Sequence, residues 1–493
     1  MKIKNEIFLI CLIFFILLSI SFVSANQNDT ILANDNDEIL ALDENDIQGQ
    51  ANEGENEVLS AEKGSYSELE EAFLDNDIFN FEKDYEAGSG DGVINIKKSI
   101  EINGKGHSID AKGYTGIFQA DSSESDNIDI TIKNLIFENG KRDFGGAIFV
   151  KNADNVKLTL INCTFISNAA NEDGGAIYFD SSQGELSIID STFTKNNGLF
   201  STSHKSNGGA INVQDAYSFT IEGSYFKDNK AYGHGGVIYS EKILSIDKSE
   251  FEGNDAVGKG GVLYLNGNHN FLNVTGSRFY KNGASNDGGV FFIDDTVDTI
   301  QLKDCNFTYN LASGYDVVTS GGVIFNNGGG TIYAINSNFT ENRAIFTGVF
   351  IFSEVVYDFR GGAIYTGADM YISGCEFINN TASNKGGAVY AGGSILWGDP
   401  SVFKENYVSE SYSYHGGAVY AGTFANTAKE LIFINNKAGY GGAVYINNKN
   451  EATFESCYFE NNVAHDITEG KSYGAAIYLD SSSSKLSLIN NMH

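Results

Sequence analysis

The sequence predicts an all-β fold, a right-handed parallel β-helix solenoid with a short capping helix near its N-terminal end. Two observations support this prediction: an unusual composition and a pair of motifs that alternate along the chain. The 493 residues include 56 glycines, one proline and 13% aromatic residues, while only 19% are charged. Such a mixture is unusual for a compact globular domain and suits stacked strands joined by turns.

Two motifs alternate over residues 141–493. A Gly-Gly pair, followed by a small, an aliphatic and usually an aromatic residue, begins at Gly145, Gly174, Gly208, Gly235, Gly260, Gly288, Gly321, Gly361, Gly386, Gly416 and Gly441, with a degenerate copy at Gly474. The second motif, Phe-x-x-Asn, begins at Phe165, Phe193, Phe226, Phe251, Phe279, Phe307, Phe339, Phe377, Phe403, Phe433 and Phe459. Internal repetition of this kind is the sequence signature of a solenoid.

The spacing between the two motifs is rigid on one side only. From Gly-Gly to the next Phe it stays between 16 and 20 residues, whereas from Asn to the next Gly-Gly it varies from 5 to 19. Strands that stack in register need constant lengths, but a corner that faces solvent accepts loops. We therefore predict one variable corner, with its longest loop between Arg343 and Arg360.

Three residue columns are predicted to form the core: the repeat Phe, the aliphatic residue after Gly-Gly, and a Ser or Cys two residues before each Phe. The Cys members are Cys163, Cys305, Cys375 and Cys457. No two neighbouring copies carry Cys and strands lie about 4.8 Å apart, so we expect four unpaired thiols. The Asn of Phe-x-x-Asn is expected at a corner in left-handed geometry, with its amide bonded to backbone and to the neighbouring coil.

The fifth residue of the Gly-Gly motif is aromatic in 11 of 12 copies. Strand alternation places this column opposite the aliphatic one, on the outer face. Stacking between coils explains such a column, and so does an exposed row that binds sugars or proteins. The candidate partner-binding residues are Tyr178, Tyr239, Tyr264, Tyr365, Tyr390, Tyr420, Tyr445, Tyr478, Arg343 and Arg360.

The segments before the repeats have other compositions. Residues 1–25 predict a signal peptide, since Lys2 and Lys4 precede an apolar run that ends in Val23-Ser24-Ala25; an uncleaved membrane anchor is the alternative. Residues 26–63 predict an acidic, disordered spacer. Residues 64–140 predict a cap, with an amphipathic helix over Ser65–Phe73, and the first coils. The repeats stop at His493, where another Phe is expected, which suggests a truncated chain.

The charge and the signal peptide limit the partners and the location. With 32 Lys and Arg against 64 Asp and Glu, the formal charge of −32 disfavours nucleic acids and anionic membrane surfaces. We therefore expect no nucleic-acid partner and no membrane insertion after signal cleavage. The predicted location is secreted, at the cell surface or in the cell envelope.

Parallel β-helices also include pectate lyases and polygalacturonases, so an enzyme that degrades polysaccharide is the alternative function. Gly233-His234-Gly235 and Asp294-Asp295 resemble pieces of the polygalacturonase signature, but in reversed order and without the rest of it. The seven histidines and four arginines fall at unrelated repeat positions. We therefore predict no catalytic, cofactor-binding or metal-binding residues; Asp173 and Asp287 precede Gly-Gly but lack the spaced glycine and aspartate pattern of calcium-binding repeats.

With these motifs, the repeat resembles the polymorphic membrane protein repeat of chlamydial surface autotransporters. It is also similar to adhesin-like proteins of methanogenic archaea, in which a segment like Ile100–Asp110 precedes the β-helix. The resemblance covers about residues 64–493. It implies an adhesin-like structural protein whose partners are glycans or proteins on neighbouring or host cells.

The sequence also contains six Asn-x-Ser/Thr motifs without proline. They begin at Asn28, Asn162, Asn273, Asn306, Asn338 and Asn379. This motif is the acceptor for N-linked glycans, and by itself it is weak evidence of modification. Asn162, Asn306 and Asn338 stand next to predicted core residues, so we expect their side chains to point outward.

Overall fold

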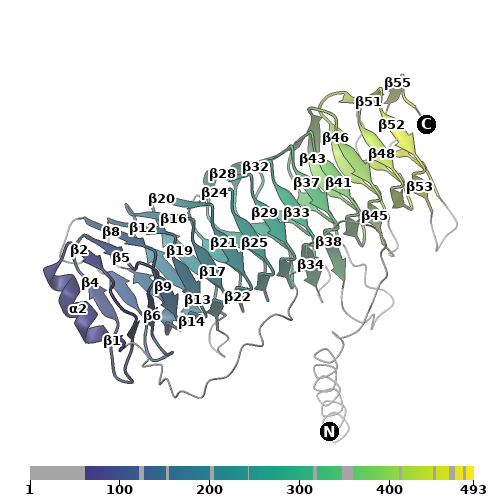
Figure 1. Cartoon of the computed structure of the whole chain (residues 1–493). Helices are drawn as coiled ribbons and strands as arrows, with labels where there is room; N and C mark the ends of the chain where they lie inside the picture. The colour runs from purple at the N-terminus through teal and green to yellow at the C-terminus, as the bar shows by residue number, and fades with distance from the viewer. Residues whose placement is uncertain are drawn as a thin grey trace, which may run out of the picture. The chain divides into compact units, whose positions relative to one another are not determined.

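A computed structural model of the chain describes residues 62–120, 127–151, 155–199, 205–242, 244–314, 319–346, 359–409, 414–447, 451–465, 472–480 and 485–492. Residues 61–493 form one compact unit, in which short strands stack coil upon coil (Figure 1). The predicted signal peptide and all but the last two residues of the predicted spacer lie outside the described residues.

The N-terminal end of the solenoid is covered by a helix. Strand β1 (Gly64–Ser65) leads into α2 (Tyr66–Asp75), whose N-terminus is capped because the Glu68 N–H donates to Ser65 Oγ at 3.3 Å. Leu69 and Phe73 are buried on one face of the helix. This confirms the predicted capping helix. No helix in the described part of the chain is long and apolar enough to span a bilayer.

One coil shows the plan of all the others. Starting at Gly145, it contains β11 (Ile148–Val150), β12 (Val156–Ile161), β13 (Thr164–Ile166) and β14 (Ala169–Asp173). Each of these strands pairs in parallel with its equivalent one coil later, so that Ile148 lies opposite Ile177 and Phe165 opposite Phe193. The predicted register is therefore confirmed.

The Phe sheet holds the strands of the Phe-x-x-Asn motif. Its fifteen strands are, in order, β1, β3 (Tyr85–Glu86), β6 (Ser108–Asp110), β9 (Ile136–Glu138), β13, β17 (Thr192–Thr194), β21 (Tyr225–Lys227), β25 (Glu250–Glu252), β29 (Arg278–Tyr280), β33 (Asn306–Thr308), β37 (Asn338–Thr340), β41 (Glu376–Ile378), β44 (Val402–Lys404), β48 (Ile432–Ile434) and β52 (Tyr458–Glu460).

The short-strand sheet follows the Asn of each coil and leads to the variable corner. Its twelve strands are β10 (Lys141–Phe144), β14, β18 (Asn197–Gly198), β22 (Lys230–Ala231), β26 (Asp255–Ala256), β30 (Gly283–Ala284), β34 (Leu311–Gly314), β38 (Arg343–Phe346), β42 (Thr381–Ala382), β45 (Tyr407–Val408), β49 (Lys437–Ala438) and β53 (Val463–Ala464).

The remaining sheet has twenty-five strands in two columns. The Gly-Gly column contains β4 (Ile94–Ile96), β7 (Phe118–Ala120), β11, β15 (Ile177–Asp180), β19 (Ile211–Asp215), β23 (Ile238–Ser240), β27 (Leu263–Leu265), β31 (Phe291–Ile293), β35 (Ile324–Asn326), β39 (Ile364–Thr366), β43 (Val389–Trp397), β46 (Val419–Phe424), β50 (Val444–Ile446) and β54 (Ile477–Leu479).

The second column of this sheet precedes the Phe sheet along each coil. It contains β2 (Ile78–Asn80), β5 (Ile100–Asn103), β8 (Ile128–Lys133), β12, β16 (Glu185–Ile189), β20 (Ser218–Glu222), β24 (Leu244–Asp247), β28 (His269–Thr275), β32 (Val297–Lys303), β36 (Thr331–Ile335), β40 (Met370–Ser373) and the end of β43. A small sheet of β47 (Ala428–Lys429), β51 (Glu451–Glu455) and β55 (Lys485–Ile489) follows at the C-terminal end.

Left-handed residues turn most coils at three places. In the coil from Gly145 these are Gly145 (φ 59°), Asn162 (φ 49°) and Ser167 (φ 56°). A Cβ on the next residue, Gly146, would lie 2.4 Å from the carbonyl oxygen of Gly175, so both glycines are required, as predicted. The prediction for the repeat Asn was wrong in one respect: the residue before it, here Ser167, takes the left-handed conformation.

The repeat Phe residues form one continuous interior stack. Phe165 and Phe193 have ring centroids 4.4 Å apart, and the column ends with Phe433 and Phe459 at 5.1 Å, with the rings close to parallel. All eleven predicted members are buried. The predicted Phe ladder is therefore confirmed.

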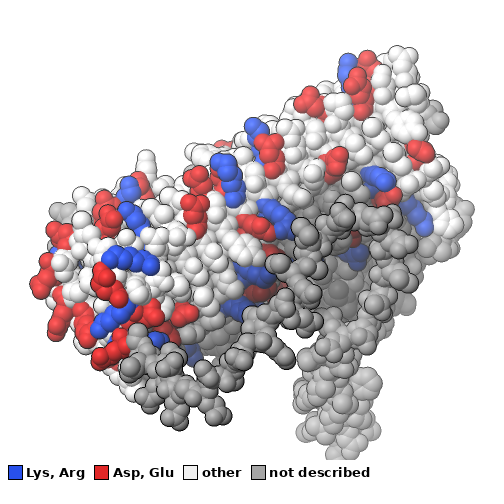
Figure 2. Space-filling model, viewed as in Figure 1, with Lys and Arg blue, Asp and Glu red and all other residues white. Residues whose placement is uncertain are grey.

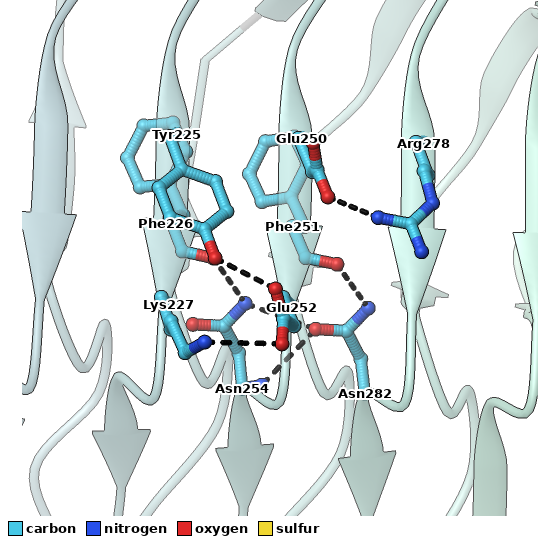
Figure 3. Close-up of polar contacts among 9 residues, drawn as sticks. All are labelled: Tyr225, Phe226, Lys227, Glu250, Phe251, Glu252, Asn254, Arg278 and Asn282. Carbon is cyan, nitrogen blue, oxygen red and sulfur yellow. Dashed lines mark hydrogen bonds and ion pairs between the residues drawn. The ribbon is translucent and has the colours of Figure 1, made fainter. Parts of the chain in front are cut away.

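The repeat Asn residues form a second buried ladder beside the Phe stack. Asn254 Nδ2 donates to Asn282 Oδ1 at 2.9 Å and to the Phe226 carbonyl at 3.0 Å (Figure 3). The same pattern recurs at Asn168, Asn196, Asn229, Asn282, Asn310, Asn342, Asn380, Asn406 and Asn436. Each coil is thus bonded to the next through its amide, as the sequence predicts.

The Ser and Cys residues form the third interior column. Cys163, Cys305, Cys375 and Cys457 are free and buried. The Cys305 N–H donates to Ser337 Oγ at 3.1 Å in the next coil, and the Cys305 thiol donates to the Lys303 carbonyl at 3.2 Å. Ser249 uses its hydroxyl in the same way toward Asp247. Ser and Cys are therefore interchangeable in this column.

Candidate partner-binding surface

The outer aromatic column is a continuous stack from Tyr239 to Tyr478. Its ring centroids are 4.6 to 5.3 Å apart, and the planes of neighbouring rings differ by at most 22°. Asn212, the one member without a ring, separates it from the shorter stack of Phe149 and Tyr178. Each ring is the second residue of a Gly-Gly strand, so the strand spacing fixes the ring spacing.

Most of this column is not exposed, so of the two alternatives stacking between coils describes it better than an open aromatic row. Tyr178, Tyr264, Tyr420 and Tyr445 are only 4 to 8% exposed. The candidates Tyr239, Tyr365, Tyr390 and Tyr478 are half-buried. The rings stack as the structural interpretation predicts, and each offers at most part of its surface to a partner.

In several coils the cover comes from the residue that precedes Gly-Gly. The Lys259 ammonium lies 4.2 Å from the Phe292 ring centroid, and the Arg360 guanidinium lies 5.0 Å from that of Tyr390. The His415 ring lies 4.4 Å from the Tyr445 ring. A cation over a ring face is attracted by the ring quadrupole. These covering residues lie at the predicted variable corner, but their packing on the rings was not predicted.

Burial changes the titration of this surface. The pKa of Lys385 is lowered by burial and by the nearby Arg360 guanidinium. Burial raises the pKa of Tyr239 to about 12, and it also raises that of Tyr390. At neutral pH these tyrosines are therefore protonated, and their hydroxyls act as hydrogen-bond donors or acceptors.

A third row borders the rings on the other side, two residues after each aromatic position. In several coils it is acidic, and there it accepts from the ring hydroxyls: Tyr264 donates to Asp294, and Tyr445 donates to Asp480 at 2.5 Å. In three consecutive coils this row is instead glycine, at Gly367, Gly392 and Gly422. Beside Tyr365, Tyr390 and Tyr420 the bordering row therefore carries no carboxylate and no side chain.

Arg360 and Arg343 have different environments. Arg360 packs on Tyr390, to whose hydroxyl its Nη1 donates at 3.4 Å, and on Tyr365 at 6.0 Å. Arg343 is exposed on β38 of the short-strand sheet, and no contact joins it to the outer rings among the described residues. Most of the predicted loop between them, residues 347–358, lies outside the described residues.

His234 and Asp294, which were considered for catalysis, both contact Tyr264. His234 packs on Tyr264 with ring centroids 4.7 Å apart, and Tyr264 in turn donates to Asp294. His234 Nδ1 accepts from the Lys259 N–H at 3.1 Å, and burial lowers its pKa. Burial, with Asp294 second, raises the pKa of Tyr264 above its ordinary value. The His234 and Tyr264 side chains are thus neutral at pH 7, and they pack against each other.

No three His, Cys, Asp or Glu side chains in the described segments come together as metal ligands. Many of the basic side chains on the surface are paired with carboxylates, and Figure 2 shows acidic and basic side chains side by side along the coils. On the Phe sheet, Lys227 lies 3.1 Å from Glu252, and Arg278 is paired with Glu250 (Figure 3). Exposed pairs of this kind contribute about 0 to 1 kcal/mol each.

The stacked parallel coils, the interior ladders and the loop-bearing corner define a parallel β-helix. Comparison with known families agrees: residues 146–339 match a right-handed β-helix region, and residues 64–171 match a pectate lyase-like adhesive domain. Residues 374–392 and 430–447 match the Chlamydia polymorphic membrane protein repeat. No significant match was found among curated proteins or among solved structures. The matches suggest a surface, adhesin-like β-helix protein without catalytic activity.

Proposed function

We propose that this chain is a cell-surface adhesin that binds acidic glycans through the part of the outer aromatic column formed by Tyr365, Tyr390 and Tyr420. The match of residues 64–171 to an adhesive domain carries the adhesin assignment. The polymorphic membrane protein repeats support surface location. The proposal also includes a relationship to the adhesin-like proteins of methanogenic archaea, and binding to neighbouring or host cells.

Three rows support this segment as the binding surface: the residues before Gly-Gly, the aromatic rings, and the residues two positions after the rings. Arg360 and Lys385 lie on one side of Tyr365, Tyr390 and Tyr420, with the Lys385 ammonium 5.8 Å from the Tyr420 ring centroid. The glycine row lies on the other side. In several other coils the bordering row carries a carboxylate such as Asp294, which would repel an anion. A sugar ring can lie against a partly exposed tyrosine while its acidic group meets the cations.

Binding to an array of neutral and acidic glycans tests the proposal. Replacing Lys385 with Ala should weaken binding of acidic glycans by about tenfold or more, the order expected for one charge-assisted hydrogen bond of about 1.5–3 kcal/mol. The matched control is Lys259→Ala, which removes the cation over Phe292 next to the acidic row and should leave binding unchanged.

Two results would contradict this assignment. Equal loss of binding in Lys385→Ala and Lys259→Ala would show that acidic glycans do not bind specifically beside Tyr365, Tyr390 and Tyr420. Release of shorter sugars from an acidic polysaccharide would favour the alternative, a β-helix enzyme of the pectate lyase or polygalacturonase kind, and would direct attention to His234 and Asp294.

A further inference from the structure

Two of the Asn-x-Thr motifs occupy neighbouring positions on the outer face of the Phe sheet. Asn306 begins β33 and Asn338 begins β37, and the two residues are register partners. Both side chains are exposed, while Phe307 and Phe339 beside them are buried. The predicted outward orientation is confirmed for both, and the two acceptor amides stand about 4.8 Å apart, one strand spacing.

The acceptor geometry is best at Asn306. Because strand residues alternate, Asn306 and Thr308 share the outer face, and the Thr308 hydroxyl donates to Asn306 Oδ1 at 2.8 Å. No hydrogen bond engages Asn306 Nδ2 within the described segments. The amide nitrogen that would be modified is therefore accessible, and the hydroxyl that defines the motif is already positioned beside it.

The other three motifs in the described part of the chain are less favourable acceptors. Asn162 is left-handed and its Nδ2 donates to Asn134 Oδ1 at 2.8 Å. At Asn273 the Thr275 hydroxyl also donates to Asn273 Oδ1, at 3.3 Å, but this Asn is half-buried and its Nδ2 donates to Ser245 Oγ at 3.4 Å. Asn379 is left-handed at a corner, and its Thr381 lies beyond that corner in the short-strand sheet. The fold thus separates one favourable pair from three poor acceptors.

We propose that the Asn306–Asn338 pair carries one N-linked glycan per molecule, at Asn306 when both motifs are intact. Asn306 Nδ2 would bond to the anomeric carbon of an oligosaccharide carried by a polyprenyl phosphate or diphosphate. The bond from that carbon to the phosphate oxygen breaks, the lipid phosphate leaves with the electron pair, and the amide loses one proton to a base of the oligosaccharyltransferase. A glycan on one amide then blocks the other, one strand spacing away.

The inference rests on the proposed surface location, because the transferase acts on exported chains. The glycan would stand on the Phe sheet, which is a different face from the Gly-Gly column. It would therefore leave the proposed binding rows uncovered. Loss of glycosylation and loss of glycan binding are separate readouts.

Mass spectrometry of the native protein from the surface fraction of the producing cell tests the proposal. Trypsin should release residues 304–343 as one peptide, because no Lys or Arg lies between Lys303 and Arg343. That peptide contains both acceptors, so its mass counts the glycans per molecule. We expect one glycan on Asn306 and unmodified Asn162 and Asn273.

Two isosteric variants make the test specific. Thr308→Val removes only the hydroxyl and should move the glycan to Asn338, while Thr308→Val combined with Thr340→Val should abolish it. An unmodified peptide from surface protein would overturn the proposal and leave the adhesin assignment standing. Two glycans on one peptide, or modification of Asn162 and Asn273, would also overturn it. A chain found only inside the cell would overturn both proposals.

Discussion

The molecule contains two parallel aromatic stacks, one inside and one outside, with almost the same ring spacing. The inner rings Phe251 and Phe279 are 4.9 Å apart, and the outer rings Tyr365 and Tyr390 are 5.1 Å apart. The inner column is all Phe and fully buried. The outer column is mostly Tyr and is bordered by charged residues, asparagine or glycine. Strand spacing fixes the stacking in both, so stacking alone does not indicate a binding site; the bordering residues make the difference.

The largest contrast should appear when one ring is removed from each stack. Phe279→Ala empties a fully buried position and should cost about 3–5 kcal/mol of unfolding free energy. Tyr365→Ala removes a half-buried ring and should cost about 1–2 kcal/mol. Urea denaturation of the two variants measures both. Equal losses would show that the outer stack is as much part of the core as the inner one.

The buried amide ladder next to the inner stack should be the second most sensitive feature. Asn282→Ala removes the acceptor of Asn254 and the donor to Asn310 and to the Phe251 carbonyl. Buried groups left without partners cost about 1–3 kcal/mol, so we expect a loss of about 2 kcal/mol or more. The control is the exposed Asn171, whose amide contacts Asp143 on the surface and whose replacement by Ala should change stability little. A small effect at Asn282 would mean that water replaces the missing amide.

The interior could be predicted from the sequence because every coil repeats the same environment. A residue such as Phe279 meets the same neighbours as Phe251 and Phe307, so the same residue type recurs at a fixed distance from Gly-Gly. The left-handed corner was placed one residue too late because its residue types vary, with Ser167, Lys195 and Glu341 among them. Closure of the coil imposes that conformation, and composition does not reveal it.

The outer surface was less predictable for a related reason. The cover over the tyrosines comes from one position that changes from Lys259 to Arg360 to His415, and its effect depends on which ring it reaches. His234 and Asp294 are sixty residues apart in the sequence, but Tyr264, in the coil between them, brings them together. Only the register of the coils shows such contacts. The change from acidic residues to Gly367, Gly392 and Gly422 could have been read from the repeat alignment.

The smallest effect at neutral pH should follow Cys305→Ser, because Ser already fills the same column in other coils. Burial raises the pKa of the Cys305 thiol to about 11, from an ordinary value of 9.0. Below pH 9 the thiol is protonated in both folded and unfolded chains, so its contribution to stability is fully present. Between pH 9 and 11 only the unfolded chain loses the proton, and stability falls by at most about 2–3 kcal/mol per thiol. Urea denaturation at pH 7 should therefore show a difference below about 1 kcal/mol between the variant and the natural chain. At pH 10.5 the variant should gain relative to the natural chain, and a difference that stays constant with pH would contradict the buried, protonated thiol.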